Sequence, residues 1–443
     1  MSSPFFAHRH APAGSFRKLS RIKFALALLL AAHAAQAQTQ QLTLGQAQQL
    51  AVARSRQLTA QDHAADAAHE MAVAAGQLPD PVLKVGIDNL PINGADRLTL
   101  GSDFMTMRRI GVSQELTRAD KLRWRAARLE READKAQAEK QAATAAIQRD
   151  TAISWLEVFY TDQMADAIAR QTTLAHQEIE AAEAAYRGGR GSQADILAAR
   201  SALLALDDRG SEIARRRRVA GTVLARWTGA EAAVAGKPDI DTIRMDTAEP
   251  GALLAHHPQV AVLTRQQDIA QADANLAQAN QRSDWSVEVA FQQRGSAYSN
   301  MVSIGISVPL QWDRKSRQDR ELAGKLALVE QAKAERDEML RGHEAEVRTQ
   351  IVEWQSGKER LSRYTRETLP LASERSEVVL AAYRGGKATL AEVLAARSNE
   401  TETRLQALQL ELDTARLWAQ LNFLAPEDSA TGHASNNRQQ ESK

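Results

Sequence analysis

Two very long stretches of the chain, residues 118–186 and 313–383, alternate apolar and polar positions with the period of an α-helix. Apolar residues such as Ile147, Ile153 and Leu156 recur on successive turns. About seventy helical residues extend ~100 Å, which is longer than a single globular core needs. The pattern therefore predicts coiled-coil hairpins or a helical tube. Shorter helices are predicted at about 43–77, 192–228, 250–281 and 389–424.

Between these helices, four short segments alternate apolar and polar residues at every second position, as β-strands do. In the segment LKVGI, Leu83, Val85 and Ile87 share one face, and the segments WSVEVAF and IGISV alternate in the same way. Alternating segments of about ten residues, separated by polar turns, are typical of outer-membrane β-barrels. A hairpin half-buried on a soluble core is the alternative. Strands are predicted at about 82–90, 104–116, 285–293 and 301–310.

The predicted number of strands has a consequence for assembly. Four strands cannot enclose a water-filled lumen, because the smallest outer-membrane barrels have about eight strands and are filled with side chains. Unpaired strand edges cannot face lipid, so several chains would have to share one barrel. Two chains would leave almost no lumen, whereas three would leave room for a channel. The predicted fold class is mainly α-helical, with four strands per chain contributing to a membrane β-barrel.

The chain contains two similar copies of one layout. The segment AYRGGRGSQADILAARS at 185–201 matches AYRGGKATLAEVLAARS at 382–398, with eleven of 17 positions identical. A repeat of about 200 residues is too long for a solenoid, and it indicates a duplicated unit with pseudo-symmetry. We interpret residues 38–230 and 250–425 as two structural repeats, joined by a linker at 231–249.

The two ends of the sequence differ from the body. Residues 1–23 carry five basic residues and no acidic one, and the mostly apolar run FALALLLAAHAA and the small-residue sequence AQA follow. These features predict that residues 1–37 are a secretory signal cleaved after Ala37. A membrane anchor is the alternative, but the run is shorter than the ~20 residues that a spanning helix needs. The polar tail at 426–443 is expected to be disordered.

The composition narrows the possible functions. Hydrophobic residues make up 44% of the chain but aromatic residues only 5%, a balance typical of long helices rich in Ala and Leu. The absence of Cys excludes disulfides, thiolate metal sites and Cys-linked lipid anchors. A net charge of +1 gives no support to a nucleic-acid partner. We find no phosphate-binding loop, catalytic triad or HExxH motif, so neither an enzyme nor a cofactor is predicted.

In this combination of features the chain resembles the TolC family of outer-membrane efflux proteins. The resemblance covers essentially the whole mature chain and rests on the duplication, the order of elements and one short motif in each half. One departure is the first copy's Gln114-Glu115-Leu116, which lacks the Pro309 of the second copy's strand ending. The motif consists of Tyr186, Gly189, Leu197 and Ala199 in the first half and Tyr383, Gly386, Leu394 and Ala396 in the second.

The resemblance implies an assembly. It implies a homotrimer with a twelve-stranded barrel in outer-membrane lipid, continued by a helical tube in the periplasm. It also implies docking to a periplasmic adaptor (membrane fusion) protein and an inner-membrane RND-type pump. Within the family, residues 78–92 and 103–116 are similar to the heavy-metal branch of RND tripartite systems, whose members are CzcC- and CusC-like.

The glycine pairs Gly188-Gly189 and Gly385-Gly386 are expected to end the long helices, because glycine permits a left-handed cap and a tight reversal. The resemblance places the adaptor contact at these turns and a periplasmic gate beside them. In three copies, acids at the gate would form a cation-selective ring. A plain helical hairpin and dipole-favoured N-terminal acids are the alternatives. The predicted gate residues are Asp195, Glu392, Tyr186, Arg187, Tyr383 and Arg384.

Other signals favour packing. Met105 and Met107 suggest soft-metal ligands, but strand packing in a membrane is the preferred interpretation. His256 and His257 diverge around a helix, so no metal site is predicted. The run Arg215 to Arg218 is interpreted as a solvated or inter-helix pairing face.

The function predicted from these observations is a passive exit duct for heavy-metal cations, with energy supplied by the inner-membrane pump. The same duct for drugs, organic solutes or secreted polypeptide is one alternative. A periplasmic coiled-coil scaffold or adaptor without a channel is the other.

Overall fold

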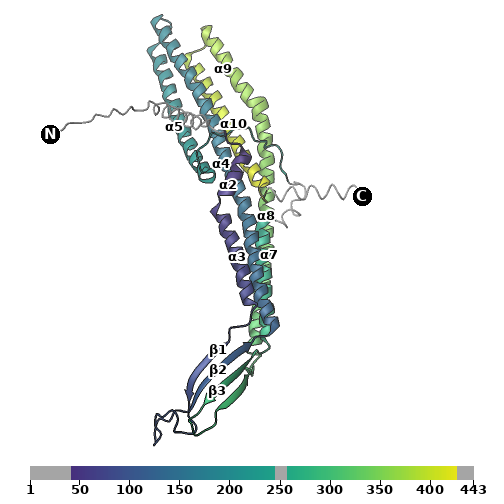
Figure 1. Ribbon diagram of the computed structural model, residues 1–443. Helices are drawn as coiled ribbons and strands as arrows, with labels where there is room; N and C mark the ends of the chain where they lie inside the picture. The colour runs from purple at the N-terminus through teal and green to yellow at the C-terminus, as the bar shows by residue number, and fades with distance from the viewer. Residues whose placement is uncertain (1–40, 245–256, 427–443) are drawn as a thin grey trace, which may run out of the picture.

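The computed structural model describes residues 41–244 and 257–426. They form a long, narrow body with a small β-sheet at one end and two helical hairpins at the other (Figure 1). Within these ranges, no helix is both long and apolar enough to cross a membrane. The predicted signal at 1–37 and most of the predicted tail lie outside the described residues.

Each half of the chain contributes helix, two strands and a long helical hairpin in the same order; among the described residues, the first half has one more helix before its strands, and a π-helix divides the long helix of the second. The first half contains α2 (Leu44–Arg54), α3 (Arg56–Ala75), β1 (Val82–Asp88), β2 (Met107–Leu116), α4 (Ala119–Arg187) and α5 (Gln193–Thr228). The second contains α7 (Pro258–Asn280), β3 (Trp285–Gln293), β4 (Met301–Ser307), α8 (Gln318–Arg363), the π-helix η1 (Tyr364–Thr368), α9 (Leu369–Arg384) and α10 (Leu390–Asn422).

The four strands form one antiparallel sheet in the order β1-β2-β3-β4. Leu83 is paired with Val112, Val112 with Val289, and Val289 with Ile304, so one row of apolar side chains crosses the whole sheet. This apolar face is open to solvent in the single chain, and Ile304 is 74% exposed. A face of this kind is normally covered by lipid or protein. Strands β1, β2 and β4 are slightly shorter than predicted.

Next to the sheet, four helices lie side by side in the order α3, α4, α7, α8. In the part of these helices nearest the sheet, alanine is frequent at the buried positions, including Ala68, Ala72, Ala133 and Ala272. Such small side chains let long helices approach closely, so the helical layer is thin and the chain does not build a globular core here.

Farther from the sheet, α4 packs between α5 and α10, and α10 packs against α9. The largest hydrophobic cluster lies in the middle of the body, around Trp155 and Trp354. The Trp155 indole N–H donates to the Leu42 carbonyl at 2.8 Å, and that of Trp354 donates to the Ile240 carbonyl at 3.1 Å. Two non-helical segments, one before α2 and one after α5, are thus fastened to the middle of the long helices.

The long helical stretch predicted at 313–383 is present, but it starts later and is not a regular α-helix throughout. Helix α8 begins only at Gln318, and the π-helix η1 separates it from α9. Pro370 lies in the first turn of α9 and has no N–H to donate to a carbonyl four residues earlier. The Leu369 N–H instead donates to the Tyr364 carbonyl, five residues back. In the first half, α4 contains no proline and continues without a break for 69 residues.

Candidate functional site

The two hairpin turns lie at the end of the body farthest from the sheet (Figure 1). We call residues 185–192 and 382–389 the tip. Gly189 and Gly386 adopt positive φ angles of 68° and 70°, and the next residue of each turn donates back to the helix, as in a Schellman cap. The glycine pairs therefore end the helices as predicted. Contact of the tip with an adaptor stays a prediction.

The predicted gate acids have a local structural role. Asp195 and Ser192 form a capping box at the start of α5, and Glu392 and Thr389 form one at the start of α10. Hydrogen bonds from the backbone N–H and then the side chain of Ser192 hold the pKa of Asp195 below its usual value. Hydrogen bonds from the backbone N–H and then the side chain of Thr389 likewise lower the pKa of Glu392. Both carboxylates are thus ionised at neutral pH. Each also lies in the first turn of its helix, where the helix dipole favours an acid, and this is the alternative to a gate role that the sequence left open. A gate role stays a prediction.

The remaining predicted gate residues are less constrained. Tyr383 packs against the small tip cluster, a group of buried apolar side chains formed by Ala182, Ala199, Leu390 and Val393. Tyr186 is exposed. Across the described residues, no side-chain hydrogen bond or ion pair is formed by Tyr186, Arg187, Tyr383 or Arg384 in the single chain.

Sequence reasoning missed an ion pair near the tip that joins the two hairpins. The Arg397 Nε atom of α10 lies 3.6 Å from a carboxylate oxygen of Glu178 on α4, and these side chains are only 16% and 13% exposed. Burial raises the pKa of Glu178, and the neighbouring Arg397 opposes that rise. The sequence did mark Arg397, because it belongs to the LAARS segment that occurs in both halves. Nothing in the sequence indicated that its partner, Glu178, lies on the other hairpin.

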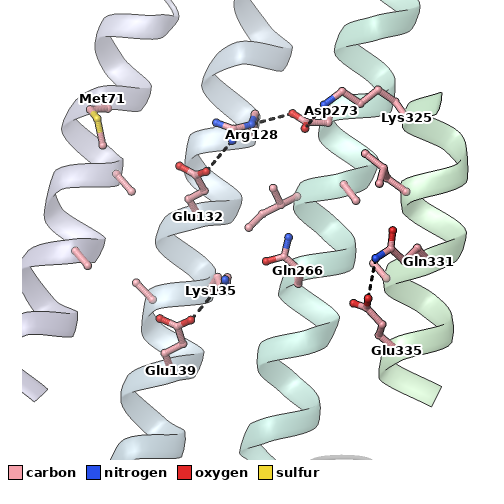
Figure 2. Close-up of a pocket in the computed structure, with 17 residues that line it drawn as sticks. Met71, Arg128, Glu132, Lys135, Glu139, Gln266, Asp273, Lys325, Gln331 and Glu335 are labelled. Atoms are coloured by element: carbon pink, nitrogen blue, oxygen red, sulfur yellow. Dashed lines mark hydrogen bonds and ion pairs between the residues drawn. The ribbon is translucent and has the colours of Figure 1, made fainter. Parts of the chain in front are cut away.

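A second charged network crosses the helices near the sheet (Figure 2). Asp273 of α7 binds Arg128 of α4 at 2.8 Å and Lys325 of α8 at 2.9 Å. Lys135 and Glu139 face the same groove and pair with each other. The ion pairs of Asp273 connect α4, α7 and α8 and so hold the layer together. Lys135 and Glu139 pair within α4, so these charges too are neutralised by one another.

The sheet has a polar face opposite its apolar one. Lys84, Arg109 and Glu288 lie on it and form ion pairs across three strands. Met107, which is paired with Asp88, also lies on this face. Met105 precedes the strand. The interpretation of both methionines as part of a membrane strand therefore does not hold for Met105, because β2 starts only at Met107.

The histidine and arginine signals are explained by packing. The His257 ring accepts a hydrogen bond from the Gln259 N–H as the cap of α7, and its centroid lies 4.6 Å from that of His343. Burial, His343 and Arg149 together lower the pKa of His257 to about 4. His256 lies outside the described residues, which contain no group of three or more potential metal ligands.

The arginine run on α5 forms pairs with α4. Arg216 lies 3.4 Å from a carboxylate oxygen of Glu157, and Arg217 contacts Asp162. For these two arginines, the interpretation as an inter-helix pairing face is confirmed.

Comparison with known proteins identifies the fold of the chain through solved structures. No model of a known protein family matches the chain, and no curated protein matches it. Among solved structures, the outer-membrane channel OprN is 17% identical at a TM-score of 0.71, covering 86% of this chain and 89% of that chain. The outer membrane protein VceC of Vibrio cholerae is 16% identical at 0.70, covering 86% and 95%. CusC, described in terms of transmembrane channel formation, is 13% identical at 0.71, covering 86% and 91%.

These likenesses cover nearly the whole described chain, sheet and helical body together. At such low identities they show the fold alone. The chain therefore has the fold of outer-membrane channel proteins.

Proposed function

We propose that this chain is the outer-membrane exit duct of a tripartite efflux system and a member of the TolC family. The observation that carries the proposal is the sheet: four strands with one exposed apolar face and one polar face, at the end of a long helical body. Its fold is shared with outer-membrane channels. An apolar face outside and a polar face inside is the arrangement of strands in a transmembrane barrel.

The edges of the sheet support a shared barrel. Within the described residues, β1 and β4 each have a neighbouring strand on one side only. In lipid, the free N–H and C=O groups of such edges need partners. A second copy of the chain supplies them if β4 of one chain pairs with β1 of the next. Three copies close a ring of twelve strands, and the helices continue that ring into the periplasm as a tube. The residues 1–37 serve as the export signal.

The tip is the natural place for the periplasmic gate and the adaptor contact, because it lies opposite the membrane end. In the trimer, Asp195 and Glu392 of each chain surround the entrance, and their lowered pKa values keep them charged at neutral pH. Such a ring favours cations. This preference and the resemblance to the heavy-metal branch support metal cations as the cargo, delivered by an adaptor and an inner-membrane pump.

Two matched substitutions test the orientation of the sheet. Ile304→Lys places a charge on the apolar face, and Ser303→Lys places it on the polar face one residue away. A lysine facing the middle of a bilayer costs about 2–4 kcal/mol, whereas a lumen-facing one does not. We expect the first variant to be depleted from the outer-membrane fraction and the second to remain there and to conduct ions in planar bilayers. Equal membrane assembly of the two variants would contradict the duct.

A further inference from the structure

Four charged side chains meet on the polar face of the sheet. The Lys84 Nζ atom lies 2.6 Å from a carboxylate oxygen of Glu288, and Arg109 contacts the same carboxylate. The Arg109 guanidinium also lies 3.8 Å from the Asp88 carboxylate. Glu288 is 22% exposed. It is therefore a single acid held between two cations that come from two other strands.

The strand register leaves room for this cluster. Lys84 is paired with Gly111, and Arg109 is paired with Gly86. Glu288 is paired with Gly305 on its other side. At Gly86 and Gly305, a Cβ atom would meet nothing within 4 Å.

Gly111 has a different role. A Cβ atom there would lie 2.7 Å from the Ala290 side chain, so glycine is needed for the two strands to approach. The row through Lys84 continues with Gly111, Ala290 and Ser303, all of them small. The neighbours in the row of Lys84 are thus small, whereas the row of Arg109 continues with Gln292 and Met301.

We propose that Glu288 sets the ionic preference of the strand-built part of the duct by neutralising Lys84 and Arg109. The inference rests on the proposed function, in which the polar face lines the lumen. Two cations and two anions cancel within the cluster of each chain. Without the Glu288 charge, the cluster of every chain would carry one net positive charge. The intact cluster is neutral, so that a cation admitted at the tip meets no positive barrier at this level of the lumen.

A purely structural role for the cluster makes a different prediction. If the ion pairs only fix the strand register, then replacing Glu288 would change the stability of the sheet but not the preference for ions. Electrical measurements separate the two roles, because they report the charge of the lumen in molecules that have assembled.

The test uses Glu288→Gln in planar bilayers under a potassium chloride gradient. We expect the ratio of cation to anion permeability to fall about 25-fold. In water, one unit charge about 4 Å away changes each permeability about fivefold, and it lowers that of the cation while it raises that of the anion. The double variant Lys84→Met with Glu288→Gln removes one charge of each sign and is expected to restore the wild-type reversal potential. An unchanged reversal potential in a conducting Glu288→Gln protein would overturn the role proposed for Glu288 and would leave the proposed duct intact. A wild-type protein that does not conduct would overturn the duct, and the proposal with it.

A chemical measurement checks the electrostatics without conduction. The chain has no Cys, so Ser303→Cys introduces a single thiol on the polar face. We expect Glu288→Gln to raise the ratio of its reaction rates with anionic and cationic methanethiosulfonates by a similar factor. The thiol at Ile304→Cys, on the opposite face, is the control for access and is expected to react with neither charged reagent, because that face lies against lipid. An unchanged ratio at Ser303→Cys would contradict the proposal.

Discussion

The two hairpins end in nearly the same sequence but use the same arginine in different ways. Arg200 of the first LAARS sequence pairs with Glu183 at 2.8 Å within its own hairpin, and the two side chains are 59% and 34% exposed. Arg397 of the second pairs with Glu178 of the other hairpin and is largely buried. When 185 is aligned with 382, Leu380 takes the place of Glu183, so Arg397 lacks that acid; within its own hairpin it pairs with Glu400 at 3.5 Å instead.

The turns themselves are alike in both copies. Each has a glycine with a positive φ angle and a capping box, formed by Ser192 with Asp195 and by Thr389 with Glu392. The two halves thus share the features that short-range sequence controls, whereas their contacts between hairpins differ. The Glu178–Arg397 pair joins the hairpins beside the small tip cluster, so we expect it to limit their separation.

A large difference between the hairpins is expected when the two arginine pairs are broken separately. Arg397→Gln leaves the Glu178 carboxylate buried without that cation, and removal of one partner of a buried pair is strongly destabilising. Allowing for partial exposure, we expect opening of the tip to become easier by about 2 kcal/mol. Arg200→Gln, in an exposed pair, should change it by less than about 1 kcal/mol. Amide hydrogen exchange of α9 and the start of α10 measures both. Equal effects would show that the two hairpins are held in the same way.

A second pair of variants compares the two tryptophans in the middle of the body. Trp155→Phe and Trp354→Phe each leave a backbone carbonyl without its indole donor, which costs about 1–3 kcal/mol when the carbonyl stays buried. Trp155 is the more completely buried of the two, so its loss should lower the unfolding midpoint in denaturant more. A larger effect at Trp354 would contradict this ranking.

The capping boxes should respond equally. Ser192→Ala and Thr389→Ala each remove one side-chain acceptor at a helix N-terminus, at a cost of about 1 kcal/mol. The pKa of Asp195 or Glu392 should rise toward its usual value in the corresponding variant, because the hydroxyl donor is lost. Carboxyl titration by NMR of labelled protein reports the shift. A response at one cap only would show that the two turns differ in energy although their geometry is alike.

The smallest expected effect is a dependence on pH that only one hairpin has. Burial raises the folded-state pKa of Glu178, so the folded state takes up its proton more readily than the unfolded state does. This carboxyl therefore favours the folded tip at low pH, and its contribution is lost as the pH rises through the raised pKa. Glu178→Gln should remove that part of the pH profile of hydrogen exchange. Glu183→Gln is the control and should leave the profile unchanged.

Local sequence predicted the regular elements well. The alternation in LKVGI and the helical period of 118–186 gave β1 and α4 nearly to the residue. The second long helix was predicted less well, because the effect of Pro370 on the backbone was not taken into account. Both successes depend on contacts within one element, where spacing along the chain decides which residues share a face.

The ion pairs could not be predicted in this way. Lys84 and Glu288 are 204 residues apart and meet only because β2 lies between their strands. Glu178 and Arg397 meet because α10 packs on α4. Such partners depend on tertiary packing, so sequence patterns identified the acids that start helices, Asp195 and Glu392, rather than the charged clusters that cross between elements.

The central claim is that several copies of the chain share one sheet. The most direct test is the mass of the mature protein, extracted from outer membranes in mild detergent and measured by light scattering with the detergent contribution subtracted. A mass of three chains is the predicted result, since it pairs every strand edge and leaves room for a lumen. A single chain in the soluble periplasmic fraction would contradict the shared barrel, and the duplicated helices would then belong to a scaffold.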